Sequence, residues 1–469
     1  MTALCMNIQT ASPSQQPLFS DFPSFALAPV QRKKVSLDFQ GGSITSDAGV
    51  LLLSETESQT GIIATLAKCI TDNRRSSSVT HPVFDLVAQR AFQIACGYED
   101  GNDSNTLRKD PALKMALDRL PDSGTDLASQ PTFSRLENMV TRSELYRMGV
   151  GFLNHFLTSY AEQPSIIVLD FDDTGDVVHG NQQLAFFSGY HQETVYQPLY
   201  VFEGLSGKLI TSILRPGKRP LGKEIVAYLK RIVHHIRQQW PKTIIVYRGD
   251  SHYGVPTVFD FIDQQPDCFS ITGLGGNSVL YRQVQSLIEE VKTQKPGYRR
   301  YHTFWYQAGS WRAARKVVAK VELTEQGGLN VRFISTDMLQ SKAQVLYEQI
   351  YSARGNDELY IKDHKTYTKS DRTSCHRFLA NQFRLFLHSA AYVLLHAFRS
   401  NLLQGTELAT ATFESVRSKL LKTGARIIEK KTKINVHLPT AHPYKGMITK
   451  CLTIFEHLRS VPWSPPAIA

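Results

Sequence analysis

The chain has 469 residues, of which 42% are hydrophobic and 10% aromatic, so it is long enough for two to four structural units with sizeable cores. Its formal net charge of +11 favours polyanionic partners, nucleic acid first, although a merely basic surface gives the same balance. The six cysteines form no C-x-x-C pair, and the most apolar helical stretch, FRLFLHSAAYVLLHAFR, is interrupted by Arg384, His388 and His396. These features argue against disulfide scaffolds, zinc ribbons and membrane-spanning proteins, and they predict a cytoplasmic protein.

The first third of the chain is predicted to be an arm followed by a helical region. Residues 1–35 are rich in Ser, Pro and Gln, which predicts a flexible arm. Residues 36–162 carry apolar residues at three- and four-residue steps, as in HPVFDLVAQRAFQIACG and RSELYRMGVGFLNHFLTSYAE. Between these stretches Pro131 suits the first position of a helix. Two helices meeting there could form a helix-turn-helix-like reader or part of an ordinary bundle, and we expect this region to bind DNA.

The pattern changes to strands at residue 165. SIIVLDF, VYQPLYVFEG and KLITSILR predict three successive strands. A long amphipathic helix, GKEIVAYLKRIVHHIRQQW, precedes a fourth strand, KTIIVYRGD, and the helix VPTVFDFIDQQ precedes a fifth strand, CFSITGL. This order is typical of an α/β fold with a ribonuclease-H-like core, in which three antiparallel strands are followed by a crossover to parallel ones.

The remaining segments complete the predicted organisation. The first part of the core is predicted at 163–275 and the second part at 337–400. The second part carries a predicted helix that contains Glu358. Between them, residues 276–336 contain hairpin-like stretches such as RRYHTFWYQAGSWRAARKVVAKVEL, which predict a β-rich insertion. Residues 401–469 are predicted to be a basic helical region, in which residues 417–433 hold seven Lys and Arg against one Glu.

The stretch SIIVLDFDDTGD ends in a cluster of carboxylates. Alternate residues of a strand share a face, so Asp170 and Asp172 project together while Asp173 points away. Asp250 ends the fourth predicted strand, and ligands collect at C-terminal strand ends in α/β sheets. The first and fourth strands are neighbours in a ribonuclease-H-like core, so Asp172 and Asp250 could meet there. Such oxygen ligands suit a hard cation, Mg²⁺ or Mn²⁺.

The same stretch permits another interpretation. From Asp170 to Thr174 it spells D-x-D-x-T, the nucleophile motif of haloacid-dehalogenase-type phosphatases, in which Asp170 would be the nucleophile and Asp172 the acid–base. That fold requires a helix soon after the nucleophile strand and a second acidic motif downstream. This chain continues with two more strands and has Gly254 where the second acid belongs, so the phosphatase is the less favoured alternative.

A third carboxylate is predicted on a helix in YSARGNDELYIKDHK. On a regular helix Tyr351, Arg354, Glu358 and Lys365 fall within an arc of roughly 60°, and Lys362 joins the same stripe. One face would then present an aromatic ring, a guanidinium, a carboxylate and two ammonium groups. A solvated stripe of ion pairs would have the same spacing.

At these residues the chain resembles a known group of proteins. Tyr-(2)-Arg-(3)-Glu-(6)-Lys is the YREK signature of bacterial insertion-sequence DDE transposases of the cut-and-paste type. The resemblance is to the IS-thirteen-eighty family in particular, and it covers roughly residues 36–450. Further stretches carry it, namely LDFDDTGDVVHGNQ, LRPG at 214–217, YRGDSHYG and ANQFRLFLHSAAYVLL.

The resemblance implies a site and a reaction. Asp172, Asp250 and Glu358 would form the catalytic triad and hold two Mg²⁺ or Mn²⁺ ions, with Asp170 in a supporting role. The substrate would be double-stranded DNA, at transposon ends and target, which a homodimer would cleave and join in a synaptic complex at the nucleoid. A relative that binds DNA without cutting it is the alternative.

The resemblance also implies contacts to DNA. Tyr351, Arg354 and Lys365, with Lys362 beside them, would grip the DNA backbone near the scissile phosphate. A tryptophan of the insertion stacks on a flipped base in some relatives. Trp305 and Trp311 are the candidates here, and Trp311 is the one that we assign to DNA.

Overall fold

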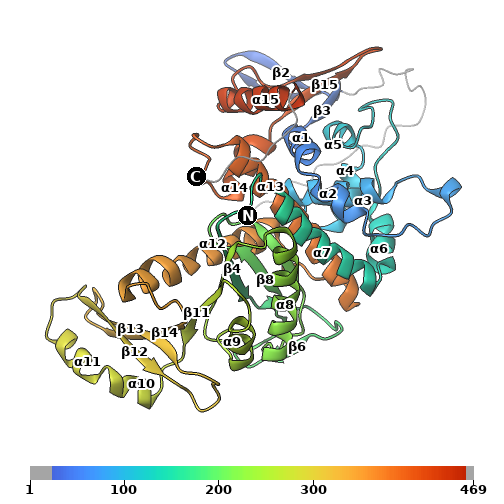
Figure 1. Ribbon diagram of the computed structural model, residues 1–469. Helices are drawn as coiled ribbons and strands as arrows, with labels where there is room; N and C mark the ends of the chain where they lie inside the picture. The colour runs from blue at the N-terminus through green and yellow to red at the C-terminus, as the bar shows by residue number, and fades with distance from the viewer. Residues whose placement is uncertain (1–23, 461–469) are drawn as a thin grey trace, which may run out of the picture.

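The structure is a computed structural model that describes residues 24–460, and its centre is an eight-stranded mixed sheet (Figure 1). The strands follow one another across the sheet in the order β12, β13, β14, β11, β10, β4, β8 and β9. Their bounds are Arg299–Tyr306 (β12), Arg315–Leu323 (β13), Leu329–Thr336 (β14), Cys268–Leu274 (β11), Ile244–Gly249 (β10), Ile166–Asp173 (β4), Leu199–Glu203 (β8) and Leu209–Ile213 (β9).

The strand directions agree with those expected from the sequence. β4 pairs antiparallel with β8, and β8 pairs antiparallel with β9. On its other side β4 pairs parallel with β10, which pairs parallel with β11. The first and fourth predicted strands, β4 and β10, are therefore neighbours, and their C-terminal ends lie at the same edge of the sheet. The crossover between β9 and β10 is the amphipathic helix α8 (Gly222–Gln239).

Helices cover both faces of the β4–β8–β9 part of the sheet. Residues alternate between the faces along each strand, so each strand contributes apolar side chains to both cores. From β8, Tyr200 and Phe202 pack into the same core as the long helix α13 (Phe378–Leu402). Leu199 and Val201 point the other way, into a core shared with α8 and α9 (Pro256–Ile262). The sheet is therefore buried on both sides at the strands that carry the carboxylates.

The N-terminal region is helical, as predicted, and packs around α13. Pro131 lies in the first turn of α6, and Thr141 and Glu144 form a capping box at the start of α7. The helices of this region are α1 (Val50–Thr60), α2 (Ile62–Ala67), α3 (Val83–Ala95), α4 (Ser104–Leu107), α5 (Pro111–Ala116), α6 (Gln130–Met139) and α7 (Arg142–Thr158), with 3₁₀ turns η1 (Ser76–Ser78) and η2 (Gly101–Asp103).

The segment 276–336 differs in part from its prediction. It begins with two helices, α10 (Ser278–Gln283) and α11 (Gln285–Lys292), whose apolar side chains pack on β13. Its three strands do not form a separate hairpin layer, because β14 pairs antiparallel with β11 and so extends the central sheet. The helices were missed because they are only 6 and 8 residues long.

Both ends of the described chain also differ from prediction. Residues 24–35 were assigned to a flexible arm but belong to a hairpin of β1 (Phe25–Val30) and β2 (Lys33–Leu37), while residues 1–23 lie outside the described part. The basic C-terminal region is only partly helical, with α14 (Phe413–Val416), the π-helical turn η6 (Arg417–Leu421) and α15 (Lys445–Ser460).

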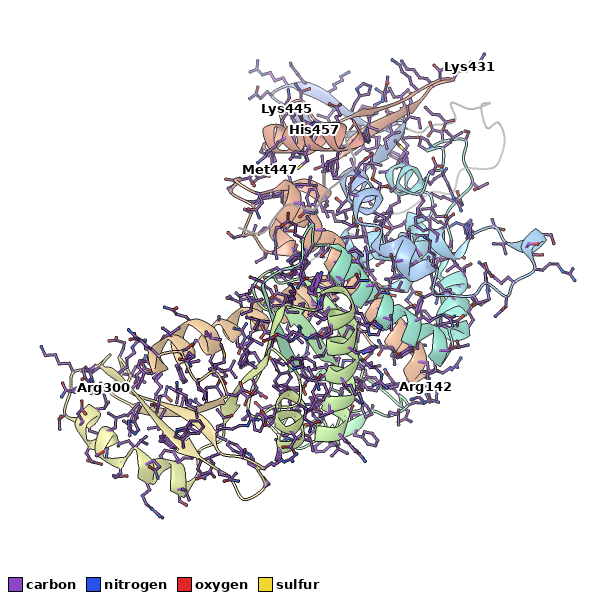
Figure 2. All side chains as sticks on the ribbon, viewed as in Figure 1. Arg142, Arg300, Lys431, Lys445, Met447 and His457 are labelled. Atoms are coloured by element: carbon purple, nitrogen blue, oxygen red, sulfur yellow. The ribbon has the colours of Figure 1, made fainter. Side chains whose placement is uncertain are left out.

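Between these helices the C-terminal region contains a hairpin. β15 (Ala425–Glu429) pairs with β16 (Ile434–His437) and with β3 (Ser43–Thr45) from the N-terminal region. Ala425 and Ile427 are buried while Arg426 is exposed, a period of two that favours a strand over the expected helix. Lys431 lies at the far end of this hairpin, as Figure 2 shows, and Lys445 and His457 lie on α15 below it. Within residues 24–460 no helix is both long and apolar enough to cross a membrane.

Candidate active site

Two of the predicted acids lie at neighbouring strand ends. The register of β4 and β10 pairs Asp170 with Arg248 and Phe171 with Gly249, so Asp172 and Asp250 follow one step further along. Burial raises the pKa of Asp172 to about 7; Arg354 opposes this shift, and the charges of Asp250 and Asp173 add to it. The backbone N–H of His252 donates to Asp250 Oδ1 at 2.7 Å, which orients that carboxylate. The structure therefore brings Asp172 and Asp250 together as predicted.

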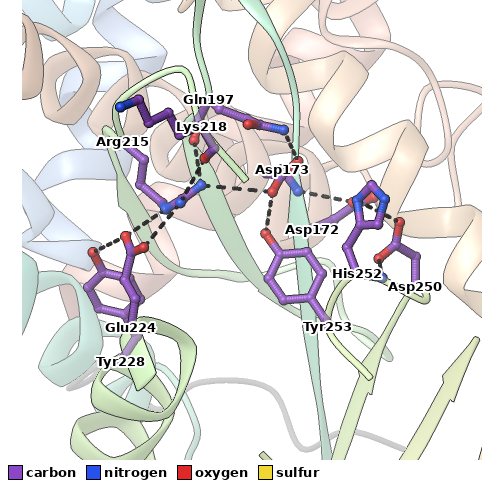
Figure 3. A network of polar contacts seen from close by, with 10 residues as sticks. All are labelled: Asp172, Asp173, Gln197, Arg215, Lys218, Glu224, Tyr228, Asp250, His252 and Tyr253. Atoms are coloured by element: carbon purple, nitrogen blue, oxygen red, sulfur yellow. Dashed lines mark hydrogen bonds and ion pairs between the residues drawn. The ribbon is translucent and has the colours of Figure 1, made fainter. Parts of the chain in front are cut away.

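Asp173 points to the opposite face and is held by structural contacts, as Figure 3 shows. Tyr253 Oη donates to Asp173 Oδ2 at 2.7 Å, and Gln197 Nε2 donates to Asp173 Oδ1 at 3.1 Å. Arg215 Nη1 lies 3.9 Å from Asp173 Oδ2. This carboxylate fastens the end of β4 to the loop after β10, and it acts on Asp172 only through its charge.

Asp170 shares the face of Asp172 but is 0% exposed and forms an ion pair with Arg248, Nε to Oδ1 at 2.5 Å. A phosphatase of the haloacid-dehalogenase type would need Asp170 as an accessible nucleophile on a strand between parallel neighbours. Here Asp170 does not reach solvent, and β8 beside it runs antiparallel. The phosphatase alternative is therefore wrong, because the Asp170 carboxylate is buried in an ion pair with Arg248.

The helix that carries the signature residues is not regular. It consists of the π-helical turn η3 (Val345–Tyr351), the 3₁₀ turn η4 (Ser352–Arg354), the short helix α12 (Gly355–Lys362) and a second π-helical turn, η5 (Asp363–Tyr367). The regular α-helix assumed for the predicted stripe is therefore not what the structure has, although Arg354 and Glu358 still contact each other. Interruptions of this kind are frequent at functional sites.

Arg354 connects two of the predicted acids. Its Nη1 lies 3.0 Å from Asp172 Oδ2, and its Nη2 lies 3.7 Å from Glu358 Oε1. The side chain of Glu358 is 69% exposed, so it lies at the rim of the site rather than in it. Among residues 24–460 no three His, Cys, Asp or Glu side chains are close enough together to hold a metal ion. The three carboxylates offer oxygen atoms, which fit Mg²⁺ or Mn²⁺, with the Arg354 guanidinium between two of them.

Lys365 and Tyr351 contact protein groups of the same edge. Lys365 Nζ lies 3.1 Å from Oδ1 of the fully buried Asp176 and donates to the carbonyl oxygen of Gly175. Burial raises the pKa of Asp176 to about 6, and Lys365 opposes that shift. Tyr351 is close enough to β11 that a Cβ at Gly273 would lie 2.8 Å from its hydroxyl oxygen. Both side chains therefore dock the helix on the sheet, whereas Lys362 is exposed.

The two tryptophans of the insertion differ in exposure. Trp311, the one assigned to DNA, is 8% exposed and packs edge-on against Phe259 and Tyr306. Its ring has no face available for a base, so that assignment is corrected. Trp305 on the edge strand β12 is 61% exposed.

Sequence reasoning did not assign roles to two further residues of this region. Arg248 lies beneath the acids, and its only signal in the sequence is its position two residues before Asp250. Asp357 is 0% exposed, and neither of its oxygens has a hydrogen-bond partner within the described part of the chain. Burial raises the pKa of Asp357 well above its usual range, and the charges of Asp170 and Asp172 add to the shift. Its adjacency to Glu358 gave no indication of this burial.

One of three comparisons with known proteins identifies the family of this chain. The family model described as "Transposase DDE domain group 1" matches residues 27–460. A search among curated proteins finds no match. Among solved structures the chain is similar to the piggyBac transposase in a cryo-EM structure of its synaptic complex with hairpin DNA, at 9% identity, with 80% of each chain covered and a TM-score of 0.41. The match to the family model extends over nearly the whole chain, and the protein therefore belongs to the family of transposases with a DDE domain of group 1.

Proposed function

We propose that this protein is an active insertion-sequence transposase that binds double-stranded DNA at transposon ends, cleaves it and joins it to a target. The observation that carries the proposal is the register of β4 and β10, in which Asp172 and Asp250 each follow the last paired residues at one sheet edge. Arg354 then joins Asp172 to Glu358 through one guanidinium. Membership of the transposase family makes DNA the expected substrate of these acids.

Asp172, Asp250 and Glu358 are the proposed ligands of two Mg²⁺ or Mn²⁺ ions. Such ions, when bound, would activate the attacking oxygen and stabilise the leaving oxygen of an in-line phosphodiester displacement. For all three carboxylates to converge, Arg354 must release Asp172 and Glu358 must turn inward from the rim. The released guanidinium is then available for a DNA phosphate, where Arg binds bidentately.

The finer family assignment rests on sequence spacing. Tyr351, Arg354, Glu358 and Lys365 have the spacing of the YREK signature, which supports membership of the group that includes the IS-thirteen-eighty family. We also infer a ribonuclease-H-like core, supported by the strand order β9, β8, β4, β10 and β11 with its change from antiparallel to parallel pairing.

Positive charge on the upper part of the molecule supports the proposed binding of DNA. The side chains of Lys430, Lys431 and Lys433 are exposed around the turn of the β15–β16 hairpin, where Figure 2 labels Lys431. Contacts between such side chains and phosphates release counterions, so binding should weaken steeply with salt. A homodimer would hold two transposon ends in one synaptic complex at the nucleoid.

The test is cleavage of the element's own terminal sequences with Mg²⁺. We expect wild-type protein to nick and then join these ends. Asp172→Asn, Asp250→Asn and Glu358→Gln should each reduce cleavage by about 10³-fold or more while DNA binding persists. Glu289→Gln is the control, because that carboxylate lies on α11 and pairs only with Lys292 among the ion pairs of the described chain.

The exposed position of Glu358 favours a second candidate, a relative that binds DNA without cutting it. The same assay separates the two candidates. If folded wild-type protein binds its own ends at nanomolar concentration but never cleaves them with either Mg²⁺ or Mn²⁺, the second candidate holds and the proposed activity is rejected.

A further inference from the structure

A buried arginine lies directly beneath the two acids at the strand ends. The side chain of Arg248 on β10 is 1% exposed. Its Nε and Nη2 donate to Oδ1 and Oδ2 of Asp170 on β4, each at 2.5 Å. Its third nitrogen, Nη1, donates to the carbonyl oxygen of Ile350 at 2.5 Å. One guanidinium thus joins two strands to the helix that carries Arg354 and Glu358.

The position of this contact relates it to the site. Asp170 and Arg248 are register partners and stand two residues before Asp172 and Asp250 respectively. Residues two apart in a strand project to the same face, so the ion pair forms the layer under the acids. Ile350 lies in the last turn of η3, four residues before Arg354 and eight before Glu358. Movement of the chain at Ile350 would therefore move both residues relative to the strands.

The surrounding backbone leaves room for this pair. A Cβ at Gly204, just after β8, would collide with Asp170 Oδ2 and Arg248 Nη2. Only a guanidinium can serve this geometry, because its planar fork carries N–H donors on three nitrogen atoms in fixed directions, whereas a lysine ammonium cannot bind Asp170 bidentately and also reach Ile350. A buried ion pair is seldom a net source of stability. Its location under the acids instead favours a role in geometry.

We propose that Arg248, oriented by Asp170, is a positioning residue that sets the distance between Glu358 and the pair Asp172 and Asp250. The inference rests on the proposed function and gives Asp170 its role. Arg248 does not touch DNA or the ions. It holds the helix at Ile350, and Glu358 would turn inward to the acids from that fixed base once Arg354 has released Asp172. A displacement of about 1 Å at such a base costs about 100-fold in rate.

The experiment compares Arg248→Lys with Arg315→Lys by two measurements. Arg315 is a matched control, because it is also buried, lies in the same sheet on β13, and pairs with Asp263 and Asp337 away from the acids. Hydrogen exchange of the backbone amides of residues 351–362 reports the docking of the helix without requiring activity. Single-turnover cleavage with Mn²⁺ reports the effect of helix docking on the reaction. Mn²⁺ binding to the free protein reports whether metal affinity has changed.

For Arg248→Lys we expect exchange in 351–362 to increase about tenfold and cleavage to fall about tenfold or more, with Mn²⁺ affinity within about threefold of wild type. Arg315→Lys should change neither the exchange in 351–362 nor the rate of cleavage. Unchanged exchange in Arg248→Lys, or an equal effect in the control, would overturn the proposal. If wild-type protein never cleaves, the proposed function fails, yet the exchange result still decides whether Arg248 positions the helix.

A second variant protects the test against misfolding. Asp170→Leu combined with Arg248→Met removes both charges of the pair together, so neither partner is left buried without its counter-charge and the fold should survive. The contact with Ile350 is nevertheless lost. We expect a folded protein with the same increase in exchange and the same loss of cleavage. A folded double variant that exchanges and cleaves like wild type would overturn the proposal.

Discussion

Arg354 Nη1 lies 3.0 Å from Asp172 Oδ2, so a guanidinium contacts one of the three carboxylates that would hold metal ions. The contact joins a helical segment to a strand, and the two residues are 182 positions apart in the sequence. In this state Arg354 balances the charge of Asp172 and also holds Glu358 at the rim. The arrangement suggests that binding of metal and of DNA are coupled through one side chain.

Arg354→Ala should therefore separate the two binding events. Removing the guanidinium removes a competing cation from Asp172, so Mn²⁺ affinity of the free protein should rise several-fold, whereas DNA cleavage should fall about tenfold or more. Isothermal titration with Mn²⁺ measures the first effect. Lys292→Ala, which removes an exposed positive charge on α11, should leave the affinity unchanged. A weaker Mn²⁺ affinity in Arg354→Ala would contradict the prediction.

The raised pKa of Asp172 predicts a pH dependence for the metal-free protein. Its folded-state pKa of about 7 lies above the ordinary value of 3.8, so the folded state gains a proton before the unfolded state does as the pH falls. As the pH falls from about 7 to about 4, wild type should gain stability relative to Asp172→Asn. As the pH rises back to about 7, wild type should lose that stability. Midpoint temperatures from pH 5 to pH 8 measure this. A difference that is flat, or that grows with pH, would count against the raised pKa.

Lys365 should be needed for stability before any DNA is present. Lys365→Ala leaves Asp176 buried without its cation, which should destabilise the protein by about 3–5 kcal/mol. Combining it with Asp176→Asn should recover much of this loss, because no buried charge then remains. Thermal unfolding of the DNA-free proteins provides the measurement. A Lys365→Ala variant as stable as wild type would restore Lys365 to a role in DNA contact alone.

Trp305 and Trp311 should respond differently to substitution. Trp305→Ala removes an exposed ring and should weaken binding of DNA with unpaired bases by about 1–3 kcal/mol, without loss of stability. Trp311→Ala removes a buried ring that packs on Phe259 and should instead destabilise the fold by about 3–5 kcal/mol. Fluorescence anisotropy with single-stranded DNA and thermal unfolding distinguish the two. Loss of DNA binding in stably folded Trp311→Ala would reverse the assignment.

The lysines of the β15–β16 turn should contribute to affinity without reading sequence. Replacing Lys430, Lys431 and Lys433 by Gln should weaken binding equally for cognate and random DNA. The slope of log K against log[salt] should become shallower by up to about 3, because each contact with a phosphate releases about one counterion. Binding titrations at several salt concentrations give the slope. An unchanged slope would place the interface with DNA elsewhere.

Much of the fold was predictable because the responsible patterns are local. Continuous apolar runs marked β4 and β8, and the helical period of apolar residues marked the crossover helix α8, so the order of the strands followed. The hairpin of β15 and the short helices α10 and α11 were not predicted, since each is brief and depends on partners distant in the chain. β15 pairs with β3, which lies about 380 residues earlier.

The sequence by itself determined which residue types stand at which spacing: two acids that end two strands, and Tyr351, Arg354, Glu358 and Lys365 at fixed intervals. Only the tertiary structure decided what each side chain contacts. Asp170 and Asp172 have the same face and nearly the same neighbours in sequence, yet one is buried against Arg248 and the other lies beside Asp250. Burial and ion pairing depend on chain segments that fold over the strand from far away, and a short motif carries no information about those segments.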